Sequence, residues 1–382
     1  MLSLASNISA TQAVEAKYSA VFDGTDDKID CGASTNVIAN GASEASVMFW
    51  VKTTETATQY FFSIKRGAAS SAFAARTSSG KIEGVIRGST GHTFPKSTTS
   101  INDGNWHHVA ITGKASEQKI YVDGSLEDTH TDTFNMDTTT DTFLIGDHNG
   151  STFIEMTLFE FAVFNTVLDQ DNITAAYNGG KEFNLTFNQG NYNSSSNLTA
   201  YYKMGDGSFD DKANGIVHNQ DNPGFGNNLL SGNDSTFDGS NNWVEYSSSG
   251  TTGLSTGSGI LTVTLSGESS TTDSGVQISN THLGISSAGF TYYVEADVWL
   301  GTATATDFRI WMGYDNFAIS PTTTRTTFRG YITTTNTGTL KIYENTTGGD
   351  SGTFFIDNVS VKKLNGNPGV TSGGVTFSSD NP

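Results

Sequence analysis

Short runs of hydrophobic and β-branched residues recur along the chain, and many of them alternate with polar residues. Runs of this kind, separated by Gly, Asn, Asp and Ser, are typical of antiparallel β-sandwiches. Clear examples are Ala45–Thr53, Trp106–Thr112 and Lys119–Val122. The last run is followed by Asp123-Gly124, which predicts a hairpin turn because glycine accepts a positive φ.

Two segments depart from the strand pattern. Residues Asp169–Tyr177 suit a short helix, since Asp169 can serve as its N-cap and Gly179-Gly180 can end it. Residues 1–17 show no β alternation, and we interpret them as a leader and candidate anchor.

The spacing of the runs predicts an all-β protein made of two tandem antiparallel β-sandwiches of the jelly-roll type. The predicted divisions are the leader at 1–17, a first sandwich at 18–183, a structured Asn/Gly-rich connector at 184–228, a second sandwich at 229–364 and an extended tail at 365–382. The connector keeps one strand-like run, Leu198–Met204. Neither half repeats the other at a fixed period, which argues against a solenoid.

Alternation in the second half puts aromatic and charged side chains on the side away from the core. Along Tyr293–Leu300 the even-numbered residues are apolar and share one face, which leaves Asp297 and Trp299 on the other. The same pattern recurs in three later runs. The side chains predicted to point away from the core are Asp297, Trp299, Arg309, Trp311, Arg329, Tyr331 and Tyr343.

Rings in such positions need an explanation, because burying one gains about 1.5–3 kcal/mol. A glycan-binding surface is one explanation, since flat rings stack on sugar C–H faces while charged groups bind the hydroxyls. A protein interface with a loop, another domain or another subunit is the second. A different register of these strands is the third. Trp243, in contrast, is predicted to fill the core.

Composition narrows the classes of function. The chain has 382 residues, a formal net charge of −19 and one cysteine, Cys31. Nucleic-acid binding needs clustered Lys and Arg, and the sequence has no such cluster. A single cysteine excludes an internal disulfide and a zinc site built on several cysteines. No apolar run approaches the roughly 20 residues of a membrane helix, and the start lacks the features of a signal peptide.

Four ordered motifs in the first half are similar to one family. They are Ser19–Gly32, Ala45–Lys52, the W-H-H-V and V-D-G pair within Asp103–Gly124, and the closing stretch Phe153–Gly180. Together they resemble a laminin-G-like, or concanavalin-A-like, lectin domain over about residues 18–183. The resemblance implies a β-sandwich and, in many members, calcium held at the rim by Asp and backbone oxygens. The candidate ligands are Asp147 and Asn149, with Asp23, Asp26 and Asp27 as further candidates; ordinary turn chemistry is the alternative.

This family houses both glycanases and lectins, so catalytic residues have to be sought separately. The E-x-D-x-x-E motif that would place a nucleophile and an acid on one strand is lacking. Glu155 and Glu160 are five residues apart and should face opposite sides of a regular strand. We therefore expect no enzymatic activity. His107-His108 cannot easily share one metal ion, and we expect one of them to be packed and the other solvated.

The second half resembles a carbohydrate-binding-module jelly roll in its opening, Leu229–Trp243, and in its ending, Phe354–Val361. In several such modules a structural calcium ion ties the first and last strands together. By motif, the resemblance implies Asp357 as a ligand, with Asp238 or Asp234 as its partner. The alternative for Asp357 is a hydrogen bond at a turn or strand end.

The lectin-like opening and the tail sequence Asn-Pro-Gly-Val-Thr-Ser-Gly-Gly also resemble structural proteins of marine tailed bacteriophages. This implies a virion surface protein, either a fibre or a capsid decoration protein, made in the host cytoplasm. Its expected partners are capsid or tail proteins, sister subunits of a homo-oligomer, and host or environmental glycans. The alternatives are a purely architectural virion protein and a polysaccharide-degrading enzyme.

Overall fold

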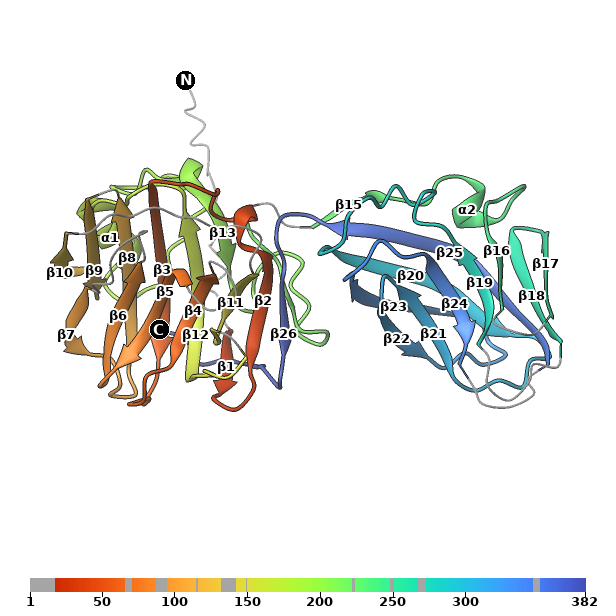
Figure 1. Cartoon of the computed structure of the whole chain (residues 1–382), viewed down its shortest axis with the longest axis horizontal. Coiled ribbons are helices and arrows are strands. Elements are labelled where there is room, and N and C mark those ends of the chain that lie inside the picture. The colour runs from red at the N-terminus through yellow and green to blue at the C-terminus, as the bar shows by residue number, and fades with distance from the viewer. Residues whose placement is uncertain are drawn as a thin grey trace, which may run out of the picture. The chain divides into compact units, whose positions relative to one another are not determined.

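Figure 1 shows a computed structural model of the chain, which describes residues 18–65, 71–86, 95–114, 116–131, 142–148, 150–221, 224–247, 251–266, 273–345 and 351–382. Most elements are strands and the helices are short, so the predicted all-β class is confirmed. The predicted leader, 1–17, lies outside the described residues.

The chain forms two compact units. The first contains Val37–Asp221 and Val370–Pro382 together with the described residues up to Asp30. The second contains Cys31–Asn36 and Asn222–Gly369. Along the chain, the second unit is therefore inserted before the last part of the first.

The first unit is a sandwich of two sheets, which we call sheet 1 and sheet 2. Sheet 1 contains β1 (Ser19–Asp23), β3 (Glu44–Lys52), β8 (Trp106–Lys114), β9 (Glu117–Val122), β10 (Ser125–His130), β12 (Glu155–Phe164), β13 (Leu198–Tyr202) and β27 (Thr376–Ser378). Their order is β10-β9-β8-β3-β12-β1-β27, and β13 also pairs with β12. The predicted hairpin is confirmed between β9 and β10, where Asp123 and Gly124 both have positive φ.

Sheet 2 contains β2 (Lys28–Ala33), β4 (Tyr60–Lys65), β5 (Ser71–Ser78), β6 (Lys81–Ile86), β7 (Lys96–Ser100), β11 (Thr142–Ile145), β14 (Ile216–Val217) and β26 (Gly369–Ser372). Their order is β14-β26-β2-β11-β4-β5-β6-β7. Aromatic rings fill the space between the sheets. The Phe49 and Phe161 rings of sheet 1 lie 5.6 Å apart, and the Phe62 ring of sheet 2 is 5.2 Å from that of Phe161.

A helix and a polar segment cover the outer face of sheet 1. Helix α1 (Gln170–Tyr177) forms where predicted, and Asp169 caps it by accepting a hydrogen bond from the Asn172 N–H at 2.9 Å. A 3₁₀ turn, Ser195–Asn197, precedes β13, which forms within the strand-like run of the predicted connector. We call α1 and residues 183–197 the cover. Its buried side chains and those of sheet 1 form one cluster that includes Met48, Ala110, Tyr121, Ala162, Phe164, Ile173, Ala176, Leu185, Tyr192 and Tyr201.

The last residues of the chain return to the first unit. Strand β26 pairs with β2, and β27 pairs with β1. Asp380 then accepts hydrogen bonds from Lys52 Nζ at 2.7 Å and from Trp106 Nε1 at 3.3 Å. The segment predicted as an extended tail thus supplies one strand to each sheet: β27 is the edge strand beside β1, and β26 lies between β2 and β14.

The second unit is a sandwich of two further sheets, which we call sheet 3 and sheet 4. Sheet 3 contains β15 (Phe225–Asn228), β17 (Thr251–Gly257), β18 (Ile260–Ser266), β20 (Thr291–Leu300), β23 (Thr326–Thr333) and β25 (Gly352–Leu364). Sheet 4 contains β16 (Val244–Ser247), β19 (Ser274–Ile278), β21 (Phe308–Met312), β22 (Asp315–Ile319) and β24 (Leu340–Glu344). The orders are β17-β18-β25-β20-β23, with β15 beside β25, and β16-β19-β24-β21-β22. The remaining short helices are 3₁₀ turn Ser34–Asn36 and α2 (Asn233–Thr236).

The core of the second unit confirms the predicted alternation. Val294, Ala296 and Val298 of sheet 3 meet Ile310 and Met312 of sheet 4 in one buried cluster. The prediction for Trp243 is also confirmed. It is 5% exposed, and its Nε1 donates a hydrogen bond to the Asp234 carbonyl at 2.8 Å.

Candidate functional site

The predicted outward residues of the second unit lie on two different sheets. Asp297, Trp299, Arg329 and Tyr331 belong to sheet 3, whereas Arg309, Trp311 and Tyr343 belong to sheet 4. Because the core lies between the two sheets, their outer faces point in opposite directions. We call the outward side chains of β20, β23 and β25 the β20 face, and those of β16, β19, β24, β21 and β22 the β21 face.

Cross-strand pairing orders the β20 face into rows of aromatic and charged side chains. The successive rows hold Tyr293 with Tyr331, Glu295 with Arg329, Asp297 with Thr327 and Asp357, and Trp299 with Phe355. Rows two residues apart along a strand are separated by about 6.6–6.8 Å. The face therefore has a pair of aromatic rings at each end and two rows of polar side chains between them.

Arg325, just before β23, joins the two carboxylates of this face. Its Nε and Nη2 donate to Asp297 Oδ2 at 2.9 and 2.7 Å, and Nη2 also donates to Asp357 Oδ2 at 2.5 Å. Burial alone would raise the pKa of Asp297, but hydrogen bonds from Thr327, Arg325 and Asn358 hold that pKa below its ordinary value. Asp297 is therefore an ionised acceptor that is fixed in place before any ligand arrives.

The Trp299 ring lies beside this charged group. The Arg325 guanidinium carbon is 5.0 Å from the ring centroid, and the Phe355 ring is 5.3 Å away. Trp299 and Phe355 are both partly exposed, and neither is part of the buried core. A partly exposed indole next to fixed hydrogen-bonding groups suits a ligand with one apolar and one polar side. Arg325 was not predicted from the sequence, because it lies just before β23 and so outside the alternating pattern on which the prediction was based.

The β21 face has its own row of polar side chains around Trp311. Register places Gln277, Lys341, Trp311 and Asn316 side by side across four strands. Lys341 Nζ lies 4.5 Å from the Trp311 ring centroid and 3.9 Å from that of Tyr246. Tyr314, in the turn between β21 and β22, is 69% exposed, and its ring is 5.7 Å from that of Trp311 at an interplanar angle of 74°.

Tyr343 corrects one expectation for this face. It is on the outer side of sheet 4, yet only 8% of it is exposed, because the Tyr246 ring packs edge-on against it at 5.5 Å. Gly275 lies between the two on β19, and a Cβ there would come within 2.8 Å of the Tyr343 Cβ. Arg309 remains at the surface and pairs with Asp307 at 3.2 Å. Tyr343 therefore offers little ring surface, whereas Trp311 is partly exposed and Tyr314 is exposed.

The calcium candidates of the second unit have separate partners. Asp357 forms an ion pair with Arg325, so the positively charged guanidinium already lies against this carboxylate. Asp234 accepts hydrogen bonds from the Asn242 N–H at 2.6 Å and from Asn242 Nδ2 at 2.8 Å. Asp238 accepts from Thr236 Oγ1 at 2.8 Å. These partners do not favour a calcium ion held by Asp357 together with Asp238 or Asp234.

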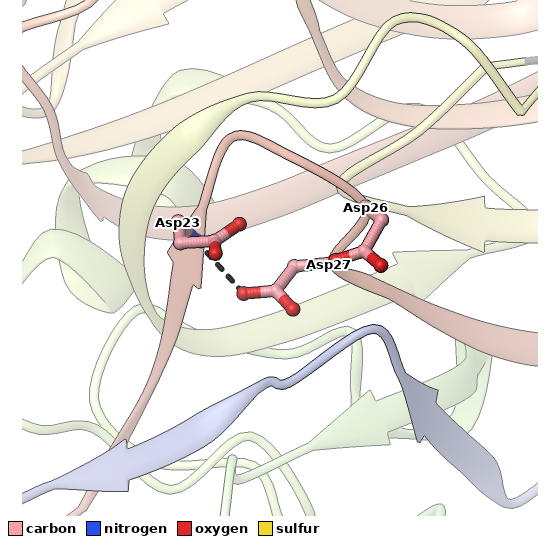
Figure 2. A group of neighbouring side chains, drawn as sticks. All are labelled: Asp23, Asp26 and Asp27. Atoms are coloured by element: carbon pink, nitrogen blue, oxygen red, sulfur yellow. Dashed lines mark hydrogen bonds between the residues drawn. The ribbon is translucent and has the colours of Figure 1, made fainter.

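Three carboxylates gather at the turn between β1 and β2. Figure 2 shows Asp23, Asp26 and Asp27, which offer ligand oxygens within 4.8 Å of one another. Asp27 is buried. Its Oδ2 accepts from the Asp23 N–H at 2.8 Å, whereas its Oδ1 has no hydrogen-bond partner. Burial raises the pKa of Asp27. Oxygen donors of this kind suit a hard cation.

The first-unit candidates at 147 and 149 form no comparable group. Asp147 is fully buried and accepts a hydrogen bond from the Gly150 N–H at 2.7 Å, as in an ordinary turn. Asn149 lies outside the described residues.

The two adjacent histidines are both buried, so the expectation that one is solvated is wrong. His107 contacts Asp123 through Nδ1 at 2.9 Å and Asp103 through Nε2 at 3.2 Å. The Asp123 hydrogen bond leads the effects that raise the pKa of His107. His108 packs against the Trp50 ring at 5.0 Å, and burial lowers the pKa of His108 to about 4. Each ring is held by its own protein neighbours.

Glu160 lies beneath the cover and not on the side opposite Glu155. The expectation failed because the register between β12 and β3 shifts at Glu160, which has a positive φ of 46°. This bulge breaks the alternation and puts Glu160 on the outer side of sheet 1, where it lines a small cavity with His108 and Phe183. Five residues of strand still separate the two carboxylates by about 15 Å, more than either glycosidase geometry uses.

Burial governs the chemistry of Glu160. It raises the pKa of Glu160 to about 8, although Lys203 Nζ lies 4.0 Å away. The Tyr201 hydroxyl donates a hydrogen bond to Glu160 Oε1 at 2.5 Å. Lys203 makes its closer contact with Glu182, at 2.9 Å. Glu160 is thus a carboxylic acid that the cover encloses and that Tyr201 holds by a hydrogen bond.

Comparison with known proteins places the first unit. The family model of the concanavalin A-like lectin/glucanases superfamily matches residues 23–174. The resemblance predicted from the sequence motifs is confirmed over this range. The protein is therefore a two-unit β-sandwich protein whose first unit is similar to concanavalin A-like lectin domains.

Two solved structures are similar to parts of the chain. The native heptameric SAP-like pentraxin from Limulus polyphemus has 15% identity and a TM-score of 0.36, over 42% of this chain and 82% of that one. A Bacteroides ovatus protein described as carbohydrate binding has 14% identity and a TM-score of 0.40, over 54% of this chain and 56% of that one. A search of curated protein sequences finds no match. Among the described residues, no helix has the length and apolar character to cross a membrane.

Proposed function

We propose that this protein binds glycans without cleaving them, and that the β20 face of the second unit is its main binding surface. One observation carries the proposal: the partly exposed Trp299 ring lies beside Arg325, whose guanidinium is clamped between Asp297 and Asp357. The lectin-like fold of the first unit supports the same class of function.

The proposed binding follows from the two kinds of group on this face. A pyranose ring would stack its C–H side on Trp299 and Phe355. Its hydroxyls would donate to the carboxylates of Asp297 and Asp357 and accept from the Arg325 guanidinium. Because these polar groups already hold one another, a ligand would meet them with little loss of side-chain freedom. Individual contacts of this kind are weak, so repeated copies of the protein would add avidity.

The same groups argue for binding without catalysis. A glycosidase needs one carboxylic acid that keeps its proton near neutral pH. Asp297 has a lowered pKa and is paired with Arg325, so it does not suit the role of that acid. Glu160 has a raised pKa, but the cover encloses it and Glu155 is about 15 Å away along the strand.

Trp299→Ala tests the proposal on an array of neutral and acidic oligosaccharides. We expect the variant to lose at least tenfold in affinity for glycans that the wild type binds through this face. Phe187→Ala, which removes a 51% exposed ring from the first unit, is the matched control and should bind as the wild type does. Binding that is unchanged in Trp299→Ala would place the site elsewhere and overturn the proposal.

We further propose that the protein is a surface component of a tailed-bacteriophage particle, either a fibre or a capsid decoration protein, that contacts glycans outside the host. The opening and tail motifs support this role, as does the charge of −19, which favours solubility at high copy number. The architectural alternative assigns the same rings to contacts with capsid proteins or sister subunits. An imaging map of an assembled particle separates the two: covered Trp299 and Trp311 rings would favour architecture.

A structural calcium ion is also a proposal, and Asp23, Asp26 and Asp27 are the described residues that suit it best. The buried Asp27 oxygen without a donor supports it, since a cation would compensate the lost hydration. We expect calcium to raise the unfolding temperature by about 2–4 °C. The shift should vanish in Asp27→Asn and persist in Asp171→Asn, an exposed carboxylate of α1. An EDTA-treated sample that does not respond to calcium would exclude the site.

A further inference from the structure

We infer that the second unit carries a second glycan-binding surface, formed by Trp311 and Tyr314 on the β21 face, so that one chain can bridge two glycans. This inference rests on the proposed function of the β20 face. It assigns a ligand to a separate set of residues on the opposite sheet.

The geometry of the sandwich separates the two surfaces. Val298 and Ile310 point into the common core, while their chain neighbours Trp299 and Trp311 point outward from sheets 3 and 4. Packed sheets lie about 10 Å apart, with the core between them. One sugar ring cannot contact both tryptophans, so each must have its own ligand or none.

Tyr314 is the observation that points to a ligand. It follows Gly313 in the hairpin turn between β21 and β22, and it has a φ of 72°. This left-handed conformation is unfavourable for a tyrosine and is ordinarily filled by Asn or Gly in such turns. The side chain is also 69% exposed, so the fold recovers little by burying the ring. Neither the backbone conformation of Tyr314 nor burial of its ring stabilises the fold. This favours a role in binding a ligand.

The two rings form a corner. Their planes meet at 74° with the centroids 5.7 Å apart, so the exposed faces of Trp311 and Tyr314 stand nearly at right angles. A pyranose could stack on one ring while its edge rests on the other. Lys341 and Asn316, the cross-strand neighbours of Trp311, would supply the hydrogen bonds.

The chemistry of the corner favours a neutral glycan. Lys341 is shared between the Trp311 and Tyr246 rings, and burial lowers the pKa of Lys341. The chain as a whole carries a charge of −19, which repels a strongly acidic polysaccharide. A ligand with hydroxyls and exposed C–H faces meets both conditions.

The experiment uses the full chain on an array of neutral oligosaccharides, followed by titration calorimetry with an oligosaccharide that the array selects. We expect the wild type to bind two oligosaccharides per chain, and Trp299→Ala and Tyr314→Gly to bind one each. The variant with both changes should bind none. Tyr314→Gly is chosen because glycine accepts the backbone conformation, so the fold of the turn is kept.

The outcomes separate this inference from the proposed function. If Trp299→Ala abolishes all binding and Tyr314→Gly changes nothing, the second surface does not exist, but the β20 face stands. If Tyr314→Gly abolishes all binding and Trp299→Ala changes nothing, the β20 proposal fails and only one surface remains. If the wild type binds no oligosaccharide on the array, both proposals fall together.

Discussion

The outer sheet faces of the two units differ in whether other segments of the chain cover them. In the first unit, α1 and residues 183–197 cover sheet 1 and bury its side chains. In the second unit, the β20 face and the β21 face leave Trp299 and Trp311 partly exposed. The unit whose sequence matches a lectin family therefore has one face closed by its own chain, and the other unit has rings on both faces.

The difference teaches that a shared β-sandwich fold does not decide where a ligand can bind. Polar groups under the cover are enclosed, which raises the pKa of Glu160 to about 8 and lowers that of His108 to about 4. On the β20 face, the buried carboxylates of Asp297 and Asp357, each 8% exposed, are instead paired with Arg325, whose side chain is exposed. The covered face stabilises the fold, and the open faces are free to serve binding. Four predictions test this division.

The largest effect is expected from Tyr192→Ala in the cover. The Tyr192 ring is fully buried, lies 5.5 Å from that of Phe183, and its hydroxyl donates to the Leu185 carbonyl at 2.9 Å. Its removal leaves a cavity and should lower the free energy of unfolding by about 3–5 kcal/mol. Urea unfolding of the full chain measures the loss, and the exposed Phe187→Ala should cost less than about 0.5 kcal/mol. Equal costs for the two changes would mean that the cover is not packed as described.

The second prediction concerns the pH dependence of the covered face. The folded pKa of Glu160, about 8, lies above its unfolded value near 4.5, so the folded state keeps a proton that the unfolded state loses. This contribution to stability is present below about pH 4.5 and is lost as the pH rises to about 8, with a slope of at most about 1.4 kcal/mol per pH unit. Glu160→Gln should flatten that slope, whereas Glu155→Gln, at an exposed position, should keep it. Urea unfolding curves recorded at intervals between pH 4.5 and pH 8 give this slope for the wild type and for both variants.

A smaller effect of the same sign is expected at His107. Asp123 raises the pKa of His107, so its protonated form stabilises the folded state below the unfolded pKa near 6.5, and the gain is lost as the pH rises through the folded value. Asp103 and Asp123 are partly exposed, which limits the gain to about 1 kcal/mol. His107→Gln should lower stability at pH 5.5 and have less effect at pH 9. An equal loss at both pH values would show that packing, not charge, is responsible.

The smallest effect on stability is expected from Trp299→Ala on the open face. Its ring is partly exposed and outside the core, so removing it should change the free energy of unfolding by less than about 1 kcal/mol. Glycan binding at the β20 face should nevertheless be lost, which leaves one bound oligosaccharide per chain in place of two. Thermal unfolding of the purified variant gives the first quantity, and the array gives the second. A loss of more than about 2 kcal/mol would assign the ring to the fold.

Local patterns predicted much of this fold. Alternation along β20 and β21 identified which side chains leave the core, and the cap at Asp169 and the turn at Asp123-Gly124 identified a helix and a hairpin. These predictions succeeded because each depends on residues a few positions apart.

The failures concern partners that lie far away in sequence. Alternation assigns a side chain to a face but not a strand to a sheet, so it could not show that Trp299 and Trp311 lie on opposite sheets. One extra residue at Glu160 reversed the predicted side of a carboxylate. The burial of Tyr343 depends on Tyr246, which lies on another strand, and the clamp on Asp357 depends on Arg325 in a loop. Neither contact leaves a periodic signal.

The return of the last strands to the first unit has a consequence for biosynthesis. Strands β26 and β27 pair with β2 and β1, yet a ribosome delivers them only after the whole inserted unit has been made. Until then, β1 and β2 each lack a neighbour and present free edges to any other nascent chain. Closing these sheets joins segments more than 300 residues apart, which makes it an intrinsically slow step. We therefore expect the inserted unit to fold first and the unit that begins the chain to be completed last.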